Sequence, residues 1–125
     1  MWVRYNNNPL GLSVGDCTVR AISAATGMDW TTAHKALCDL SNDMADMPSV
    51  DRVWWKLLEQ FGFVRRRLPN RCPDCYTVED FCEEHPKGVY ILGPYEHAVA
   101  VINGNYWDSW DSGRTIPTYY FERRQ

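Results

Sequence analysis

The order of the hydrophobic patterns along the chain predicts an α+β domain, with N-terminal helices packed on a C-terminal antiparallel β-sheet. In the first half, apolar residues recur at helical spacing in three segments. In the last third, short apolar runs are joined by Asn103-Gly104, a strong signal for a β-hairpin turn. The chain has 125 residues, which fits one domain over residues 1–125.

Helix boundaries follow from capping residues and from breaks in the apolar pattern. Gly15 or Asp16 can cap a first helix, and Gly27 can end it. The third helix has the clearest pattern, because apolar residues recur at three- and four-residue steps from Val50 to Phe61. The elements expected before the C-terminal sheet are an extended segment at 1–15, helices at about 16–27, 29–40 and 48–62, a strand at 63–68 and a short helix at 77–85.

The C-terminal sheet is expected to contain strands at 88–92, 97–102, 106–110 and 118–121. Asn103-Gly104 joins the second and third of these, because both residues readily adopt the positive φ that a tight hairpin needs. The basic run Arg65-Arg66-Arg67 falls in the earlier strand, where a solvated strand edge explains it.

Composition and charge exclude several classes of partner. The net charge is −3, without the basic excess of a nucleic-acid-binding domain. No run approaches the roughly twenty apolar residues of a membrane span, so no membrane partner is expected. The five cysteines are an odd number, and the first residues lack the apolar core of a signal peptide. We therefore expect a cytoplasmic protein without a disulfide framework.

Cys17 is the candidate nucleophile of the chain. It stands in Gly15-Asp16-Cys17, in the first turn of the first expected helix. A cysteine attacks as thiolate, and the unpaired N–H groups and dipole of a helix N-terminus favour an anion there. A buried, inert cysteine is the structural alternative, so a catalytic Cys17 needs a basic partner.

His97 is the candidate partner, because hairpin geometry places a carboxylate beside it. If Asn103-Gly104 forms a two-residue turn, counting back from it pairs His97 with Trp110. Asp108 then lies diagonally next to His97 on the same face, where it would fix the imidazole tautomer and stabilise the imidazolium. A three-residue turn would shift the register and present Asp111 instead.

Several short motifs occur in an order and spacing that match one known family. They are Gly-Asp-Cys-Thr-Val-Arg-Ala-Ile at 15–22, Ala-Thr-Gly at 25–27, His-Ala-Val-Ala-Val at 97–101, and Gly104 with Tyr-Trp-Asp at 106–108. With these motifs the chain resembles small papain-like, or C39-like, cysteine peptidases of bacteriophages and of gut and Gram-positive bacteria. The resemblance implies a papain-like fold with a helix-borne cysteine, a histidine on the following sheet and an Asp or Asn that orients it. These roles fall on Cys17, His97 and Asp108.

The resemblance also implies an oxyanion donor, because papain-like enzymes use a Gln or Asn a few residues before the cysteine. No Gln stands in that stretch, and Asn8, nine residues before Cys17, is the nearest amide. Asn8 is therefore the candidate donor, and the backbone N–H of Cys17 is a second one. Thr18 stands where many papain-type enzymes carry a Trp after the nucleophile.

A competing pattern has the ligands of a Cys3His zinc site: Cys72, Cys75, Cys82 and His85. Cys82 and His85 are three residues apart and would share a helix face. The structural alternative is that Cys82 is a buried helix position and that His85 sits at the favourable C-terminal end of the helix dipole. Apart from this zinc, no cofactor is expected.

The sequence therefore predicts a papain-like cysteine hydrolase that acts on a peptide or protein substrate by acyl transfer. The Cys17 thiolate attacks, His97 serves as base and then as acid, and Asp108 orients His97. Two alternatives belong to other classes: a catalytically inactive papain-like binding or inhibitor module of phage origin, and a small zinc-binding interaction domain. A phage-encoded protein would act in the host cytoplasm.

Overall fold

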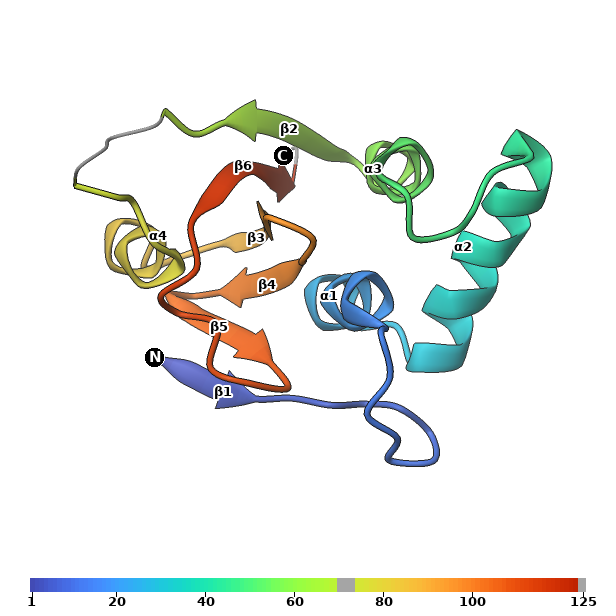
Figure 1. Cartoon of the computed structure of the whole chain (residues 1–125), viewed down its shortest axis with the longest axis horizontal. Coiled ribbons are helices and arrows are strands. Elements are labelled where there is room, and N and C mark those ends of the chain that lie inside the picture. The colour runs from blue at the N-terminus through green and yellow to red at the C-terminus, as the bar shows by residue number, and fades with distance from the viewer. Residues whose placement is uncertain (70–73, 124–125) are drawn as a thin grey trace.

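A computed structural model describes residues 1–69 and 74–123 and shows an α+β fold built on one six-stranded sheet (Figure 1). Its elements are β1 (Trp2–Arg4), α1 (Cys17–Thr26), α2 (Trp30–Met44), α3 (Asp51–Gln60), β2 (Phe63–Arg67), α4 (Val78–Glu84), β3 (Val89–Pro94), β4 (Val99–Ile102), β5 (Asn105–Asp108) and β6 (Pro117–Arg123). The predicted order of helices followed by a C-terminal sheet is confirmed.

The strand order in the sheet is β1-β5-β4-β3-β6-β2. Every neighbouring pair is antiparallel except β1 and β5, which run parallel. The sheet is therefore mixed, and the expectation of a purely antiparallel sheet is wrong at this one edge. Residues 1–15 are expected to be extended, but β1 is not predicted, because a strand of three residues is too short to carry an alternating pattern.

The hairpin between β4 and β5 has the predicted two-residue turn. Ile102 pairs with Asn105, and the turn residues Asn103 and Gly104 have φ values of 49° and 78°. These left-handed conformations suit Asn and Gly and match the twist of the two strands. β4 begins at Val99, which pairs with Leu92 of β3, so it begins two residues later than the expected strand.

The sheet is covered on both faces, and successive residues of each strand face opposite layers (Figure 1). On one face α1 packs against the sheet, with α2 and α3 beyond it, and Ile91 and Ala100 belong to this cluster. On the other face lies α4, and Leu92 and Val99 belong to that cluster. The candidate nucleophile, Cys17, is the first residue of α1 and therefore lies on the first of these two faces.

Helix α1 begins at Cys17 and has Asp16 as its N-cap residue. Gly27 ends it in the left-handed conformation, with its N–H donating to the carbonyl of Ser23. Apolar residues of α1 are buried against the sheet, so the helix N-terminus is held at a fixed point above the strand ends.

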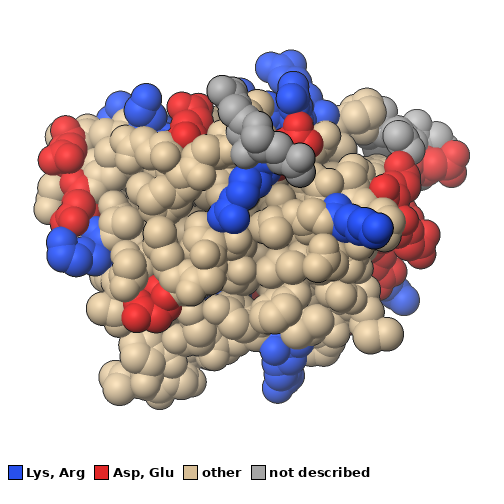
Figure 2. All heavy atoms as spheres, turned by 180° about the vertical axis from the view of Figure 1, so that it is seen from behind, with Lys and Arg blue, Asp and Glu red and all other residues tan. Residues whose placement is uncertain are grey.

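Charged side chains are scattered over the face shown in Figure 2, and Lys and Arg do not gather there into one patch. Within residues 1–69 and 74–123, no helix has the length and apolar character needed to cross a membrane.

We expect Gly104→Ala to lower the free energy of unfolding by more than about 1 kcal/mol, because an L-residue is strained at φ 78° and its Cβ would lie 3.3 Å from the backbone oxygen of Cys82. Gly62→Ala is the matched control, since Gly62 has φ 88° but open space around its Cβ position. Urea unfolding of both variants measures the difference. Equal losses would contradict a contribution from the close contact.

Candidate active site

The candidate residues meet at one end of the sheet. Strands β3 and β5 end there, β4 and β6 begin there, and the N-terminus of α1 points to the same place. A cleft with a volume of about 650 Å³ opens at this point. The start of α1, the start of α3, the turn between β3 and β4, and the start of β6 line it, and Cys17 and His97 are both among its lining residues. The two residues are 80 positions apart in the sequence, and the fold brings them to the same cleft.

His97 is bound by Asp108. Its Nε2 lies 2.6 Å from Asp108 Oδ2, the His97 side chain is 10% exposed, and that of Asp108 is fully buried. Asp111 has other partners, because its carboxylate accepts from the Tyr106 hydroxyl and from the N–H of Gly113. Asp108 and not Asp111 therefore lies beside His97, as predicted. The predicted pairing of His97 with Trp110 is not present, because the β4–β5 ladder ends at Ala100 and Trp107 and His97 precedes β4.

The carboxylate of Asp108 accepts four hydrogen bonds. Oδ2 accepts from His97 and from the Ser112 hydroxyl, at 2.6 and 2.5 Å. Oδ1 accepts from Arg20 and from the N–H of Ser109, at 2.9 and 2.8 Å. A buried carboxylate needs such partners to stay ionised, and here both oxygens are held in place.

Arg20 joins this carboxylate to the residue before the nucleophile. One of its terminal nitrogens lies 2.9 Å from Asp108 Oδ1, and the other lies 2.6 Å from Asp16 Oδ1. All three side chains are buried. Asp16 Oδ2 in turn accepts from the indole N–H of Trp30, at 2.9 Å. The network therefore links α1, α2 and the end of β5.

Cys17 is half-buried, and its thiol interacts with His97. Burial raises the pKa of the thiol, but a hydrogen bond with His97, the charge of His97, a backbone contact with Ala98 and the charge of Arg20 together outweigh it. The net effect is a pKa below the usual value of a thiol. Because Nε2 of His97 faces Asp108, Nδ1 is the ring nitrogen left for the sulfur.

The imidazole of His97 has a strongly raised pKa. Burial lowers the pKa, but hydrogen bonds with Asp108 and Cys17 and the charges of both residues raise it to about 9. A raised imidazole pKa beside a lowered thiol pKa favours the thiolate–imidazolium pair over the neutral pair. Trp110 lies against this pair, with its ring centroid 5.0 Å from that of His97.

Asn8 does not line the cleft, so the structure does not bring the candidate oxyanion donor to Cys17. Its side-chain oxygen accepts from the backbone N–H groups of Leu10 and Leu12, at 2.9 and 3.2 Å. Asn8 therefore shapes the loop before α1. At the cleft itself, the N–H groups of the first turn of α1, which begins with Cys17, have no acceptor within the helix.

The predicted zinc ligands are not gathered. Cys72 lies outside the described residues, and among residues 1–69 and 74–123 no three His, Cys, Asp or Glu side chains form a group that could hold a metal ion. Cys82 is buried beside Phe81, and the His85 ring stacks on Phe81 with a centroid separation of 3.7 Å. Cys82 is thus a buried position of α4, as the structural alternative predicts.

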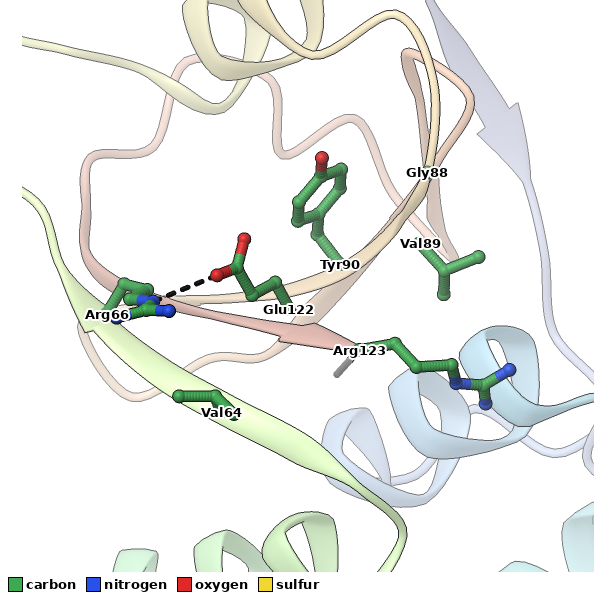
Figure 3. Close-up of a pocket in the computed structure, with 7 residues that line it drawn as sticks. All are labelled: Val64, Arg66, Gly88, Val89, Tyr90, Glu122 and Arg123. Atoms are coloured by element: carbon green, nitrogen blue, oxygen red, sulfur yellow. Dashed lines mark hydrogen bonds and ion pairs between the residues drawn. The ribbon is translucent and has the colours of Figure 1, made fainter. Parts of the chain in front are cut away.

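A second hollow, of about 790 Å³, lies on the sheet surface formed by β2, β3 and β6 (Figure 3). Across it Arg66 forms an ion pair with Glu122 at 2.9 Å, and Tyr90 stands nearby. Neither Cys17 nor His97 lines this hollow. Arg123, the third charged residue that lines it, donates instead to the carbonyl of Ala25. The smaller cleft at the end of the sheet therefore remains the candidate site, because it holds Cys17 and His97.

Two residues of the site are missing from the sequence analysis: Arg20 and Ser112. Arg20 carries a usable signal, because a basic residue three positions after Cys17 lies on the same side of the helix, one turn further on. Asp16 and Arg20 are also four residues apart, the spacing of a helical ion pair. Ser112 carries no such signal, because it lies in an irregular loop after β5 whose path depends on the whole fold.

We expect the Asp108→Asn variant to bring the titration midpoint of His97 down from about 9 toward the ordinary value, because the variant removes the negative charge that stabilises the imidazolium. NMR titration of the His97 ring measures the midpoint. Asp111→Asn is the matched control, since Asp111 binds Tyr106 and not His97. A larger shift in the Asp111 variant would contradict the assignment.

Comparisons with known proteins give no relative for this chain. No protein-family model matches it, and no curated protein and no solved structure matches it significantly. The resemblance to small papain-like peptidases therefore rests on the motifs of the chain itself, and membership of that family stays a prediction.

Proposed function

We propose that the chain is a cysteine hydrolase of the papain-like kind, which cleaves an amide bond by acyl transfer through Cys17. One observation carries the proposal. In a single cleft, a thiol with a lowered pKa at a helix N-terminus interacts with a histidine that a buried carboxylate holds at 2.6 Å. This combination of nucleophile, base and orienting group is what cysteine-dependent acyl transfer requires.

In the proposed reaction the Cys17 sulfur attacks the carbonyl carbon of the substrate. The imidazolium of His97 then gives a proton to the leaving amine as the carbon–nitrogen bond breaks, which leaves a thioester on Cys17. His97, now neutral, takes a proton from water, and the water oxygen attacks the thioester. The acid product leaves and the thiolate–imidazolium pair is restored.

The oxyanion of each tetrahedral intermediate needs hydrogen-bond donors. The backbone N–H of Cys17 is the donor that we assign, because it stands at the start of α1 without an acceptor in the helix. Asn8 is left out of the mechanism, since it does not line the cleft.

The substrate class that suits this chemistry is a peptide or isopeptide bond in a peptide or protein. The cleft has a volume of about 650 Å³ and is partly walled by aromatic side chains, among them Trp54, Tyr95 and Tyr119. A cytoplasmic location suits the proposal, because a nucleophilic thiol persists in a reducing compartment.

Labelling with iodoacetamide at neutral pH tests the nucleophile. We expect Cys17 to react much faster than Cys38 and Cys82, as read by peptide mapping, because a thiolate is the reacting form. Cys82 is the slow reference, since burial raises its pKa to about 11. His97→Ala should slow Cys17 by more than about tenfold, the change that one pKa unit gives below the midpoint.

His34→Ala is the matched control. His34 lies beside Cys38, with Nε2 3.5 Å from the sulfur. This second Cys–His pair does not line the cleft. The control should leave the rate at Cys17 unchanged. To separate a hydrolase from an inactive binding module, p-nitrophenyl acetate should acetylate Cys17 and the acetyl group should then be lost to water. Labelling of Cys17 no faster than that of Cys38 would overturn the proposal.

A further inference from the structure

Arg20 is a buried cation with a partner on each side of the candidate site. It is 5% exposed, and its two terminal nitrogens bind two different carboxylates, those of Asp16 and Asp108. The planar fork of a guanidinium is suited to such bridging, because both nitrogens are fixed in one plane. Arg20 thereby connects the helix that carries the thiol to the strand end behind the histidine.

The contacts form a closed ring of residues around the site. Asp16 is bonded through the chain to Cys17, Arg20 binds both Asp16 and Asp108, Asp108 binds His97, and His97 interacts with Cys17. Asp16 is itself held by the indole of Trp30. A displacement of Arg20 would therefore change the position of both Cys17 and His97.

Packing alone does not explain why this position is an arginine. Helix α1 is already fixed on the sheet by buried apolar side chains, among them Val19, Ile22 and Ala25. Taking charges out of water costs free energy that a buried ion pair barely recovers, and apolar replacements of such pairs are often as stable. The charge of Arg20 therefore calls for an explanation other than holding α1 in place.

That explanation lies in the charges around Cys17 and His97. Without Arg20, the buried carboxylates of Asp16 and Asp108 would have no cation between them. The groups that act on the Cys17 thiol are His97 and the backbone at Ala98, both just before β4, and Arg20 from α1. The charge of Cys17 in turn raises the pKa of Tyr119 on β6. Glu96 and Asp51 also line the cleft, both exposed to solvent.

The charge of Arg20 lowers the pKa of both Cys17 and Asp108. For Cys17 and for Asp108, burial raises the pKa, hydrogen bonding with His97 lowers it, and the positive charge of Arg20 lowers it further. Both the thiolate and the carboxylate are thus favoured by the same guanidinium.

We propose that Arg20 is a positioning residue of the catalytic pair: by bridging Asp16 and Asp108 it sets the alignment of Cys17 with His97 and favours the thiolate. The inference rests on the proposed function and adds to it a residue outside the nucleophile, the base and the orienting carboxylate. A purely structural Arg20 would affect stability and leave the ionisation of Cys17 unchanged.

The test is the pH dependence of Cys17 alkylation by iodoacetamide in Arg20→Met, a variant of similar shape without charge. We expect the acid limb of the profile to move to higher pH, because loss of the nearby cation raises the pKa of the thiol. A shift of about one pH unit would slow labelling about tenfold on that limb. Arg20→Lys keeps the charge but has a single nitrogen, so its limb should stay near that of the wild type while its maximal rate falls.

Two further variants keep the result interpretable. The double variant Asp16→Asn/Arg20→Met removes one of the two carboxylates that Arg20→Met leaves without their arginine partner. It replaces the single variant in the experiment if circular dichroism shows that Arg20→Met alone does not fold. Leu58→Ala is the control for stability, since Leu58 is a buried residue of α3 that does not line the cleft. It should lower stability without moving the limb.

The inference would be overturned if the pH profiles of the Arg20→Met variants superimposed on the wild-type profile and only stability fell, as in Leu58→Ala. This outcome is distinguishable from failure of the proposed function. The limb shift is a comparison between variants and needs no turnover, whereas the proposed function fails when wild-type Cys17 labels no faster than Cys38 or keeps its acetyl group.

Discussion

The site depends on a single buried anion, the carboxylate of Asp108. Removing a carboxylate from water is costly unless donors replace the lost hydration, and four donors do so here. They come from α1, from the turn before β4 and from the loop after β5. The backbone oxygen of Asp108 also accepts from the N–H of Tyr5 and the indole of Trp2, so the segment around β1 is tied to the same residue. The hydrogen bonds to this one residue therefore join segments that are distant in the sequence.

Cys17 and Cys82 show how far the surroundings of one side chain decide its chemistry. Both thiols lose water on folding, which by itself raises the pKa. Cys82 belongs to α4 and lies in an apolar cluster, where the charge of the N-terminal amine does not outweigh burial, so its pKa rises to about 11. At Cys17 the histidine, a backbone contact and the arginine reverse the effect of burial. Burial and a lowered thiol pKa are therefore compatible where a cation is placed beside the thiol.

Local sequence patterns predict much of this structure. Capping residues locate the ends of α1 to within a residue or two, and Asn103-Gly104 determines the hairpin register that sets Asp108 against His97. Both features depend on neighbouring residues alone. The pairing of β1 with β5, in contrast, joins residues about a hundred positions apart and leaves no mark in a three-residue segment. The ion pair of Arg20 with Asp108 also joins distant residues and could not be predicted from local patterns. Nor could the position of Asn8, whose side chain binds the loop before α1 and not the cleft.

The parallel pairing of β1 with β5 also bears on the order of events during synthesis. Trp2 pairs with Tyr106, and His97, the candidate base, lies in the last third of the chain. A nascent chain that has emerged as far as α3 contains Cys17 and Arg20 but neither His97 nor Asp108. In that state the thiol lacks the hydrogen bond and the charge of His97, which lower its pKa more than Arg20 does. The candidate site is thus assembled only once the hairpin is complete, so a partly made chain holds Cys17 without the histidine that favours its thiolate.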